Sequence, residues 1–233
     1  VAEYFELRRG WNTVVTNLMV GKACLLFMLS DTCWNEIMCQ WAARPWLYEP
    51  GKSDFLRPLL YYVTCYWPEH IAILEHAGAS KDDLSSVTEL LERFLGDPQD
   101  SSAQYQTWAR WRTFEPAKYS ILAVCEYGFH QVLDRWWNMA QLNHTFTNIR
   151  GETYMMIAAR KGHVPILRIL LKKGGAVGEQ GDKGRSSTPL IAAVNGRNFE
   201  AANFLLKEGN ADVNLEVDDM FPHMSCALEV AVN

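Results

Sequence analysis

The sequence lacks the short motifs by which common catalytic and nucleotide-binding sites are identified. Gly21-Lys22 and Gly51-Lys52 both lack the glycine five positions earlier that a phosphate-binding loop requires, and no HExxH, GxSxG or GxGxxG run occurs. His70 and His76 lie six residues apart, a spacing that does not place both on one helical face as metal ligands. These absences predict a protein that is not an enzyme and that binds no cofactor and no metal.

Long apolar runs, basic tracts and paired cysteines are also missing. The most apolar run, residues 18–29, is too short to span a membrane and is broken by Lys22. A net charge of −5 without a basic tract gives no support for nucleic-acid binding. The six cysteines show no CxxC spacing, which is typical of buried free thiols in a reducing compartment. We therefore expect a cytoplasmic protein that contacts neither membrane nor nucleic acid.

Tryptophan is absent after Trp137, and glycine is sparse in the first half. All nine Trp lie at or before that position, whereas ten of the fifteen Gly lie after residue 120. Charge divides in the same way, with 10 basic and 15 acidic side chains in residues 1–115 and 12 of each in residues 116–233. This division predicts two domains with a boundary at 115/116.

Residues 1–115 are expected to form a helical, bundle-like region. Nothing alternates with period two for long, so no strand is predicted. Polar residues that could cap helix starts precede apolar stretches with helical spacing. The candidate starts are Asn12 for residues 13–29, Ser30 or Asp31 for a helix to about residue 43, Ser53, and Ser80 for a helix ending at Gly96.

Two stretches of the second half match at a constant offset of 35 residues. TYMMIAARKGH (153–163) matches TPLIAAVNGRN (188–198), and LLKKG (170–174) matches LLKEG (205–209). A period near 33 residues with this wording resembles ankyrin repeats, over about residues 117–233. Weaker copies at 119–128 and 226–232 predict about three repeats and a truncated fourth, as in a fragment of a longer array. The resemblance implies an α-solenoid, so the predicted fold is all-α.

Each repeat position has a physical role. Thr188 is a helix cap and Pro189 suits the first turn, while Gly162 suits a turn with positive φ. Gly174 and Gly209 stand where a left-handed C-cap residue is expected. The departures from the motif are Tyr154 in place of proline, Met156 and Ile191 in place of histidine, and Arg197 in place of glycine, with Gly196 displaced by one. They leave the turn geometry of the second unit open.

The run FLRPLLYYVTCYWPEH (55–70) carries a second resemblance. It is similar to a helical segment of fungal NACHT-type NTPases that lies between their winged-helix module and a C-terminal ankyrin array, and VAEYF (1–5) is similar to the end of that winged helix. The resemblance implies a region that joins a nucleotide switch to sensor repeats. We expect Tyr66, Trp67 and His70 to pack in the helical core, and Pro68 to end or bend a helix.

Two loops are candidate partner-binding sites, because ankyrin domains bind through hairpin tips and first helices. The candidate residues are Glu179, Asp182, Lys183 and Arg185 in the loop 178–187, and Asp218, Asp219, Met220 and Phe221 in the loop 214–223. The alternative is that both loops are solvated linkers. Basic residues gather in one repeat (150–173) and acidic residues in 208–229, so a partner of complementary polarity would be steered into one orientation.

The predicted function is a non-catalytic protein–protein interaction module. The resemblances imply the sensor or scaffold portion of a larger fungal NACHT-like signalling NTPase, with a protein partner of unknown identity. Two alternatives remain: a stand-alone ankyrin adaptor, and an enzyme with a site in the Trp-rich half.

Overall fold

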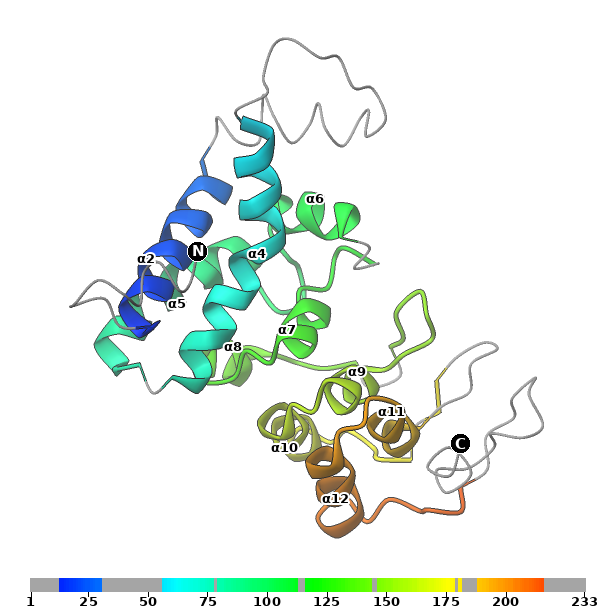
Figure 1. The fold of residues 1–233 in the computed structure, drawn as a ribbon. Coiled ribbons are helices and arrows are strands. Elements are labelled where there is room, and N and C mark those ends of the chain that lie inside the picture. Colours follow the sequence, from blue (N-terminus) through cyan, green and yellow to red (C-terminus); the bar gives the residue numbers. More distant parts are fainter. Residues whose placement is uncertain are drawn as a thin grey trace. The chain divides into compact units, whose positions relative to one another are not determined.

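The chain is all-α over the part that a computed structural model describes, which is residues 13–30, 56–77, 79–112, 116–143, 146–178, 180–181 and 188–215. Ten helices are present there, with a single isolated bridge between Gly96 and Ser101 and no strand, which confirms the predicted fold class. The helices are α2 (Thr13–Met28), α4 (Leu56–His76), α5 (Lys81–Leu95), α6 (Ala103–Trp111), α7 (Ile121–Tyr127), α8 (Asp134–Met139), α9 (Tyr154–Lys161), α10 (Val164–Lys172), α11 (Pro189–Asn195) and α12 (Phe199–Lys207) (Figure 1). The caps expected at Asn12 and Ser53, the helix over 31–43 and the repeat copy at 226–232 lie outside these residues.

Two compact units divide the chain. One comprises Val1–Thr113 and Gln131–Met139, and the other comprises Phe114–His130 and Ala140–Asn233. The first unit contains α2, α4, α5, α6 and α8, and the second contains α7 and α9–α12.

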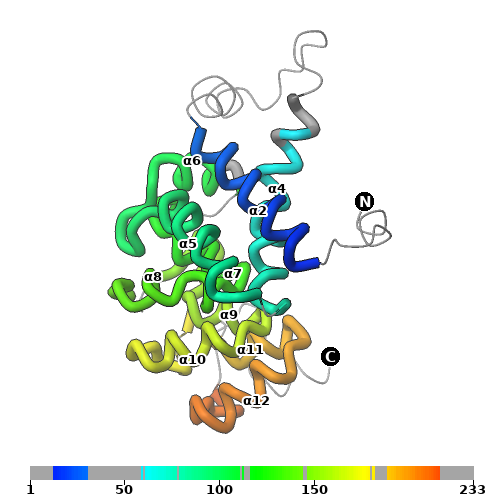
Figure 2. The backbone as a smooth tube through the Cα atoms, turned by 90° about the vertical axis from the view of Figure 1, so that its left-hand side faces the viewer, coloured from blue at the N-terminus to red at the C-terminus, as the bar shows by residue number. Residues whose placement is uncertain are grey.

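In the first unit, α2 and α4 lie side by side and run in opposite directions (Figures 1 and 2). Helix α5 also packs on α2. It begins as the sequence predicts, because the Ser80 hydroxyl accepts a hydrogen bond from the Asp83 amide at 3.1 Å. It ends at Gly96, whose φ of +76° is open to glycine at little cost.

Four aromatic side chains form the centre of this unit. Trp67 lies with its ring centroid 5.2 Å from those of both Phe94 and Trp108, and Tyr105 lies 5.6 Å from Trp108. All four are fully buried. Trp67 therefore packs in the core as predicted. The same prediction for Tyr66 is wrong, since its side chain is 45% exposed.

Pro68 lies inside α4 and does not end it. A proline has no N–H, so the carbonyl of Thr64, four residues earlier, loses its helical donor. The indole Nε1 of Trp108 donates to that carbonyl at 2.8 Å, and both residues are fully buried. Helix α6 thus supplies the hydrogen bond that Pro68 removes from α4.

A buried carboxylate holds residues 131–139 in the first unit. The two oxygens of Glu75, near the end of α4, accept hydrogen bonds from the backbone amides of Gln131 at 2.9 Å and Val132 at 3.0 Å. The Thr88 hydroxyl donates to the Val132 carbonyl at 2.8 Å, and the Trp136 indole donates to the Gly96 carbonyl at 2.9 Å. These four bonds join the segment to α4, to α5 and to the C-cap of α5, so the segment after α7 packs with helices far from it in sequence.

The second unit stacks helix pairs. First helices α9 and α11 contact each other, and each contacts the second helix of its own pair, α10 and α12 (Figure 2). Thr153 and Thr188 cap the first helices through their hydroxyls, which accept from the amides of Met156 at 3.3 Å and Ile191 at 3.2 Å. The thioether sulfur of Met156 in turn accepts a hydrogen bond from the Thr153 amide at 3.5 Å. A sulfur atom is therefore the acceptor at the position where the motif favours histidine.

The turn of the second repeat keeps its shape although its glycine is displaced. Gly162 is left-handed with φ +80°, as predicted, and Arg197 takes the matching conformation with φ +56°. Gly196 is right-handed, and a Cβ there would overlap the Arg160 carbonyl. Gly174 has a positive φ, as predicted. The prediction for Gly209 is wrong, because Asn210 adopts the positive φ in its place. Glycine is needed at 209 for another reason: a Cβ there would lie 2.7 Å from the Leu205 carbonyl oxygen.

Replacing Arg197 by glycine should raise the free energy of unfolding by about 0.5–1 kcal/mol. A non-glycine residue in the left-handed region costs about 1–2 kcal/mol, part of which the larger chain entropy of glycine offsets. Arg197 makes no ion pair within the described residues, so the substitution removes no such contact.

Denaturant melts measure this effect, with Gly162→Ala as the matched control. That change should destabilise the protein by about 1 kcal/mol or more, because φ is +80° and the new Cβ would lie 2.6 Å from the Asn198 Oδ1 atom. A destabilising Arg197→Gly would contradict the assigned turn.

Three cysteines are buried free thiols, as predicted: Cys24, Cys65 and Cys125. Burial raises the pKa of Cys24 to about 11 and also raises the pKa of Cys125, so neither is a ready nucleophile at neutral pH. Cys33, Cys39 and Cys226 lie outside the described residues.

Candidate protein-binding site

All the residues predicted to bind a partner lie outside the part of the chain that the structure describes. They are Glu179, Asp182, Lys183, Arg185, Asp218, Asp219, Met220 and Phe221. A third hairpin tip, Asn148–Glu152, precedes the first helix α9 and is described in full. It is the tip on which a candidate site can be built.

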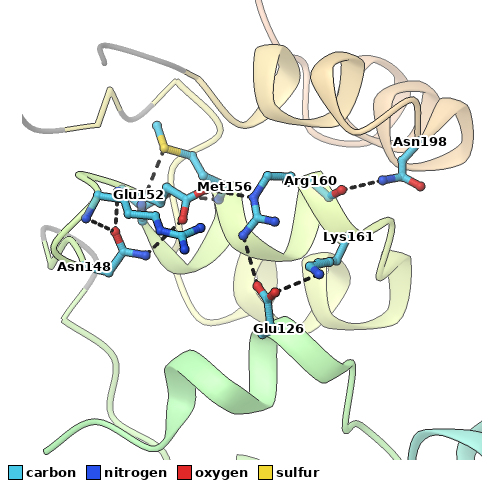
Figure 3. A network of polar contacts seen from close by, with 9 residues as sticks. Glu126, Asn148, Glu152, Met156, Arg160, Lys161 and Asn198 are labelled. Carbon is cyan, nitrogen blue, oxygen red and sulfur yellow. Dashed lines mark hydrogen bonds and ion pairs between the residues drawn. The ribbon is translucent and has the colours of Figure 1, made fainter. Parts of the chain in front are cut away.

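One side chain sets the shape of this tip. The Asn148 Oδ1 atom accepts hydrogen bonds from the amides of Arg150 at 2.8 Å and Glu152 at 2.9 Å (Figure 3). The Gly151 amide donates to the Asn148 carbonyl at 2.9 Å, and Gly151 has φ +76°. Ile149 and Arg150 occupy the outer end, where Ile149 is 67% exposed. The turn therefore presents an apolar and a cationic side chain on a fixed backbone.

A chain of polar contacts ties this tip to two helices. The Asn148 amide group donates to Glu152 at 3.0 Å, and Arg160 Nε donates to the other Glu152 oxygen at 2.8 Å. Arg160 Nη2 reaches Glu126 on α7 at 3.0 Å, and Lys161 Nζ lies 2.7 Å from the second Glu126 oxygen (Figure 3). The tip, α7 and α9 are thus joined through Arg160.

The two carboxylates keep Arg160 charged although it is half-buried. Burial is the largest single influence and lowers the pKa of the guanidinium, but Glu126 and Glu152 together more than offset it, so the pKa is raised. Bidentate or bridging arginine contacts of this kind fix orientation as well as contributing energy. Arg160 therefore positions Glu152 beneath the tip at every physiological pH.

Consecutive repeats share a second polar contact. His163 Nε2 donates to the Glu126 carbonyl at 3.0 Å, and Asn198 Nδ2 donates to the Arg160 carbonyl at 2.6 Å. In each case the side chain lies over the glycine of the preceding turn: a Cβ on Gly128 or Gly162 would lie 2.6 Å from it. His163 thus has the structural position that its place in the motif indicates.

Most of the basic residues expected to steer a partner are paired within the chain. Arg160 and Lys161 bind Glu126, as above, and Arg168 forms two hydrogen bonds with Glu208, at 2.5 and 2.9 Å. The Lys173 ammonium donates to the Ala140 carbonyl at 2.9 Å. The polarity seen in the sequence therefore links one repeat to the next, and less of it faces a partner than expected.

A metal site and a membrane-spanning helix are both absent from the described residues. They contain no group of three or more His, Cys, Asp or Glu side chains placed to hold a metal ion. None of the helices among them combines the length and apolar character needed to cross a bilayer.

The sequence held one signal for the tip. Asn148 followed by Gly151 is typical of a turn, because an Asn side chain bonds the backbone two residues on. Nothing local indicated that Arg160, eight residues later, would bind Glu152, or that Glu126 would bind Arg160 across a repeat boundary.

Comparison with known proteins agrees with this geometry. The model for ankyrin repeats matches residues 121–217, in three copies. A 62-residue part, 26% of the chain, is 45% identical to the protein named NF-kappa-B inhibitor cactus in Drosophila yakuba and in Drosophila melanogaster, and it spans 12% of the length of those relatives. Capped first helices, left-handed turns, inter-repeat hydrogen bonds and the family match together identify ankyrin repeats in residues 121–217 of the chain.

Proposed function

We propose that this chain is a non-catalytic protein-interaction module whose binding surface includes the tip Asn148–Glu152. The observation that carries the proposal is a rigid tip with Ile149 and Arg150 exposed at its end. A preorganised loop loses little conformational entropy on binding, and arginine is one of the residues that most often contribute strongly to binding at protein interfaces. The loops 178–187 and 214–223 would extend the same surface, with the eight residues named above.

The finer part of the proposal is the context: the sensor or scaffold portion of a larger, cytoplasmic, fungal NACHT-like signalling NTPase. Its support is the resemblance of residues 55–70 and 1–5 to the segment between the winged helix and the ankyrin array of such proteins. In that arrangement residues 1–115 form a connector and residues 116–233 the repeats. The full-length reading frame tests this, because a phosphate-binding loop upstream is expected and a start codon directly before Val1 would contradict it.

A second candidate is a stand-alone ankyrin adaptor. The 62-residue similarity to cactus, a protein named as an inhibitor of NF-kappa-B, favours it. Such an adaptor would hold a partner protein through its repeats without a nucleotide switch. The full-length reading frame separates the two candidates, because a phosphate-binding loop upstream would favour the NACHT-like protein over the adaptor.

Photo-crosslinking from the tip tests the binding surface. A photoreactive phenylalanine analogue at position 149, in an extract of the native cells, should give a discrete adduct. Unlabelled wild-type chain should compete it away, whereas the Ile149→Asp variant should compete at least about tenfold more weakly, as for loss of an anchor residue.

The matched control places the same probe at Leu206, an exposed leucine on α12. An adduct at 206 but not at 149 would place the partner on the second helices and contradict the proposed surface. Equal competition by wild type and Ile149→Asp would show that the adduct at 149 is non-specific.

A further inference from the structure

Exposed apolar side chains concentrate on two helices of the first unit. Helix α2 exposes Met19 (53%) and Leu26 (57%), and α4 exposes Tyr62, Tyr66 and Ile73. Helix α2 also buries Cys24, Leu25 and Met28 on its other side, so it is apolar around its circumference. A helix of that kind is normally covered on all sides. The exposed side of α2 therefore has the character of an interface.

The two exposed stripes share one pattern. On α2 the order is Met19, Lys22, Leu26, and on α4 it is Tyr66, Glu69, Ile73. Both have steps of three and then four residues, the spacing at which side chains form one face of a helix and interlock with a neighbouring helix. Each stripe thus has a charged residue between two apolar ones, and the two charges are opposite.

Both charges are available for a partner. Within the described part of the chain, neither Lys22 nor Glu69 forms an ion pair. When the two stripes are paired in opposite directions with Lys22 opposite Glu69, Met19 comes within one residue of the level of Ile73, and Leu26 within one residue of the level of Tyr66. The surface therefore carries both halves of a complementary contact.

Hydrogen bonds hold the aromatic residue Tyr62, which lies beside the α4 stripe. The Tyr62 hydroxyl donates to His70 Nε2 at 2.6 Å, His70 Nδ1 donates to Asn17 Oδ1 at 2.7 Å, and Asn17 Nδ2 donates to the Thr13 carbonyl at 2.7 Å. This chain of bonds runs from α4 to α2, which lie side by side (Figure 2). The Tyr62 and Tyr66 rings lie 5.3 Å apart between centroids. A fixed aromatic surface costs little entropy on association.

We propose that this chain forms a homodimer in which the α2 stripe of each copy packs on the α4 stripe of the other. An isologous contact uses the same surface on both copies, so it requires a self-complementary surface, as the Lys22 and Glu69 stripes provide. A second copy is the partner that supplies both stripes at once. Each dimer then contains two Lys22–Glu69 pairs flanked by apolar contacts. This contact is independent of the tip at Asn148–Glu152.

Sedimentation equilibrium of the whole chain tests the proposal. The wild type should dimerise in a concentration-dependent manner below about 100 µM, the range expected of a modest interface. Lys22→Glu and Glu69→Lys should each raise the dimer Kd at least about tenfold, because each creates two like-charge contacts per dimer. The double variant should return to within about threefold of wild type, because its pairs are restored with reversed sign.

Two further variants keep the result interpretable. Lys81→Glu makes the same charge change on an exposed position of α5 and should leave the Kd unchanged. Leu26→Ala should weaken the dimer without any charge change, while far-UV circular dichroism confirms that each variant is folded. A wild type that stays monomeric at about 100 µM, or a double variant as weak as the single ones, would overturn the proposal.

Discussion

Replacing Leu170 by alanine should lower the free energy of unfolding by about 2–5 kcal/mol, the cost of deleting a buried leucine and leaving a cavity. Leu170 is 1% exposed on α10, where Ile166 and Leu167 are buried with it. Because the Leu170 side chain is buried, its truncation leaves a cavity in the second unit. Urea melts followed by circular dichroism measure the effect.

Leu206→Ala is the matched control. It makes the same chemical change on α12, but Leu206 is 39% exposed. Its truncation should therefore cost no more than about 1 kcal/mol. Equal losses in the two variants would show that α10 and α12 do not bury the faces assigned to them.

Replacing Glu75 by glutamine should cost about 2–4 kcal/mol. A glutamine has the same shape, but its NH2 group cannot accept a hydrogen bond, so one of the two bonds that the carboxylate oxygens accept from Gln131 and Val132 is lost. A bond to a charged acceptor is worth about 1.5–3 kcal/mol, and an unsatisfied buried amide costs a similar amount. The loss should appear both in global stability and in faster hydrogen exchange at the amides of residues 131 and 132.

Glu89→Gln on α5 serves as the control, since Glu89 is exposed and forms none of the hydrogen bonds or ion pairs that the structure records. Its effect should stay within about 0.5 kcal/mol. Unchanged exchange at residues 131 and 132 in Glu75→Gln would contradict the role assigned to Glu75.

The sequence predicted what local rules control. The caps at Ser80 and Thr188 and the turn at Gly162 follow from backbone chemistry within a few residues, and the 35-residue offset located the repeats. Arg197 shows where such rules fall short: a motif that expects glycine cannot say whether the turn changes or a larger residue adopts the strained conformation. The contact of Gly196 with the Arg160 carbonyl decides it.

Hydrogen bonds between residues far apart in the chain could not be predicted from the sequence, for a different reason. Trp108 and Thr64 are 44 residues apart, and Glu75 and Val132 are 57 apart, so no periodicity within a helix connects them. Both Tyr66 and Trp67 were predicted to pack in the core, because aromatic residues usually do. Only Trp67 is buried, and Tyr66 is exposed. The candidate tip was missed because a turn sequence shows where the chain reverses and not which side chains fix it.

The division of the chain into units has a consequence for the order of folding. Residues 114–130, which contain α7, leave the first unit at Thr113 and return to it at Gln131. Once the first unit has formed, this segment is a closed loop within the chain, and the entropy of closing that loop has already been lost. Helix α7 is then restricted to few conformations before any ankyrin contact exists. Assembly of the array is therefore expected to nucleate at α7 and propagate toward α12.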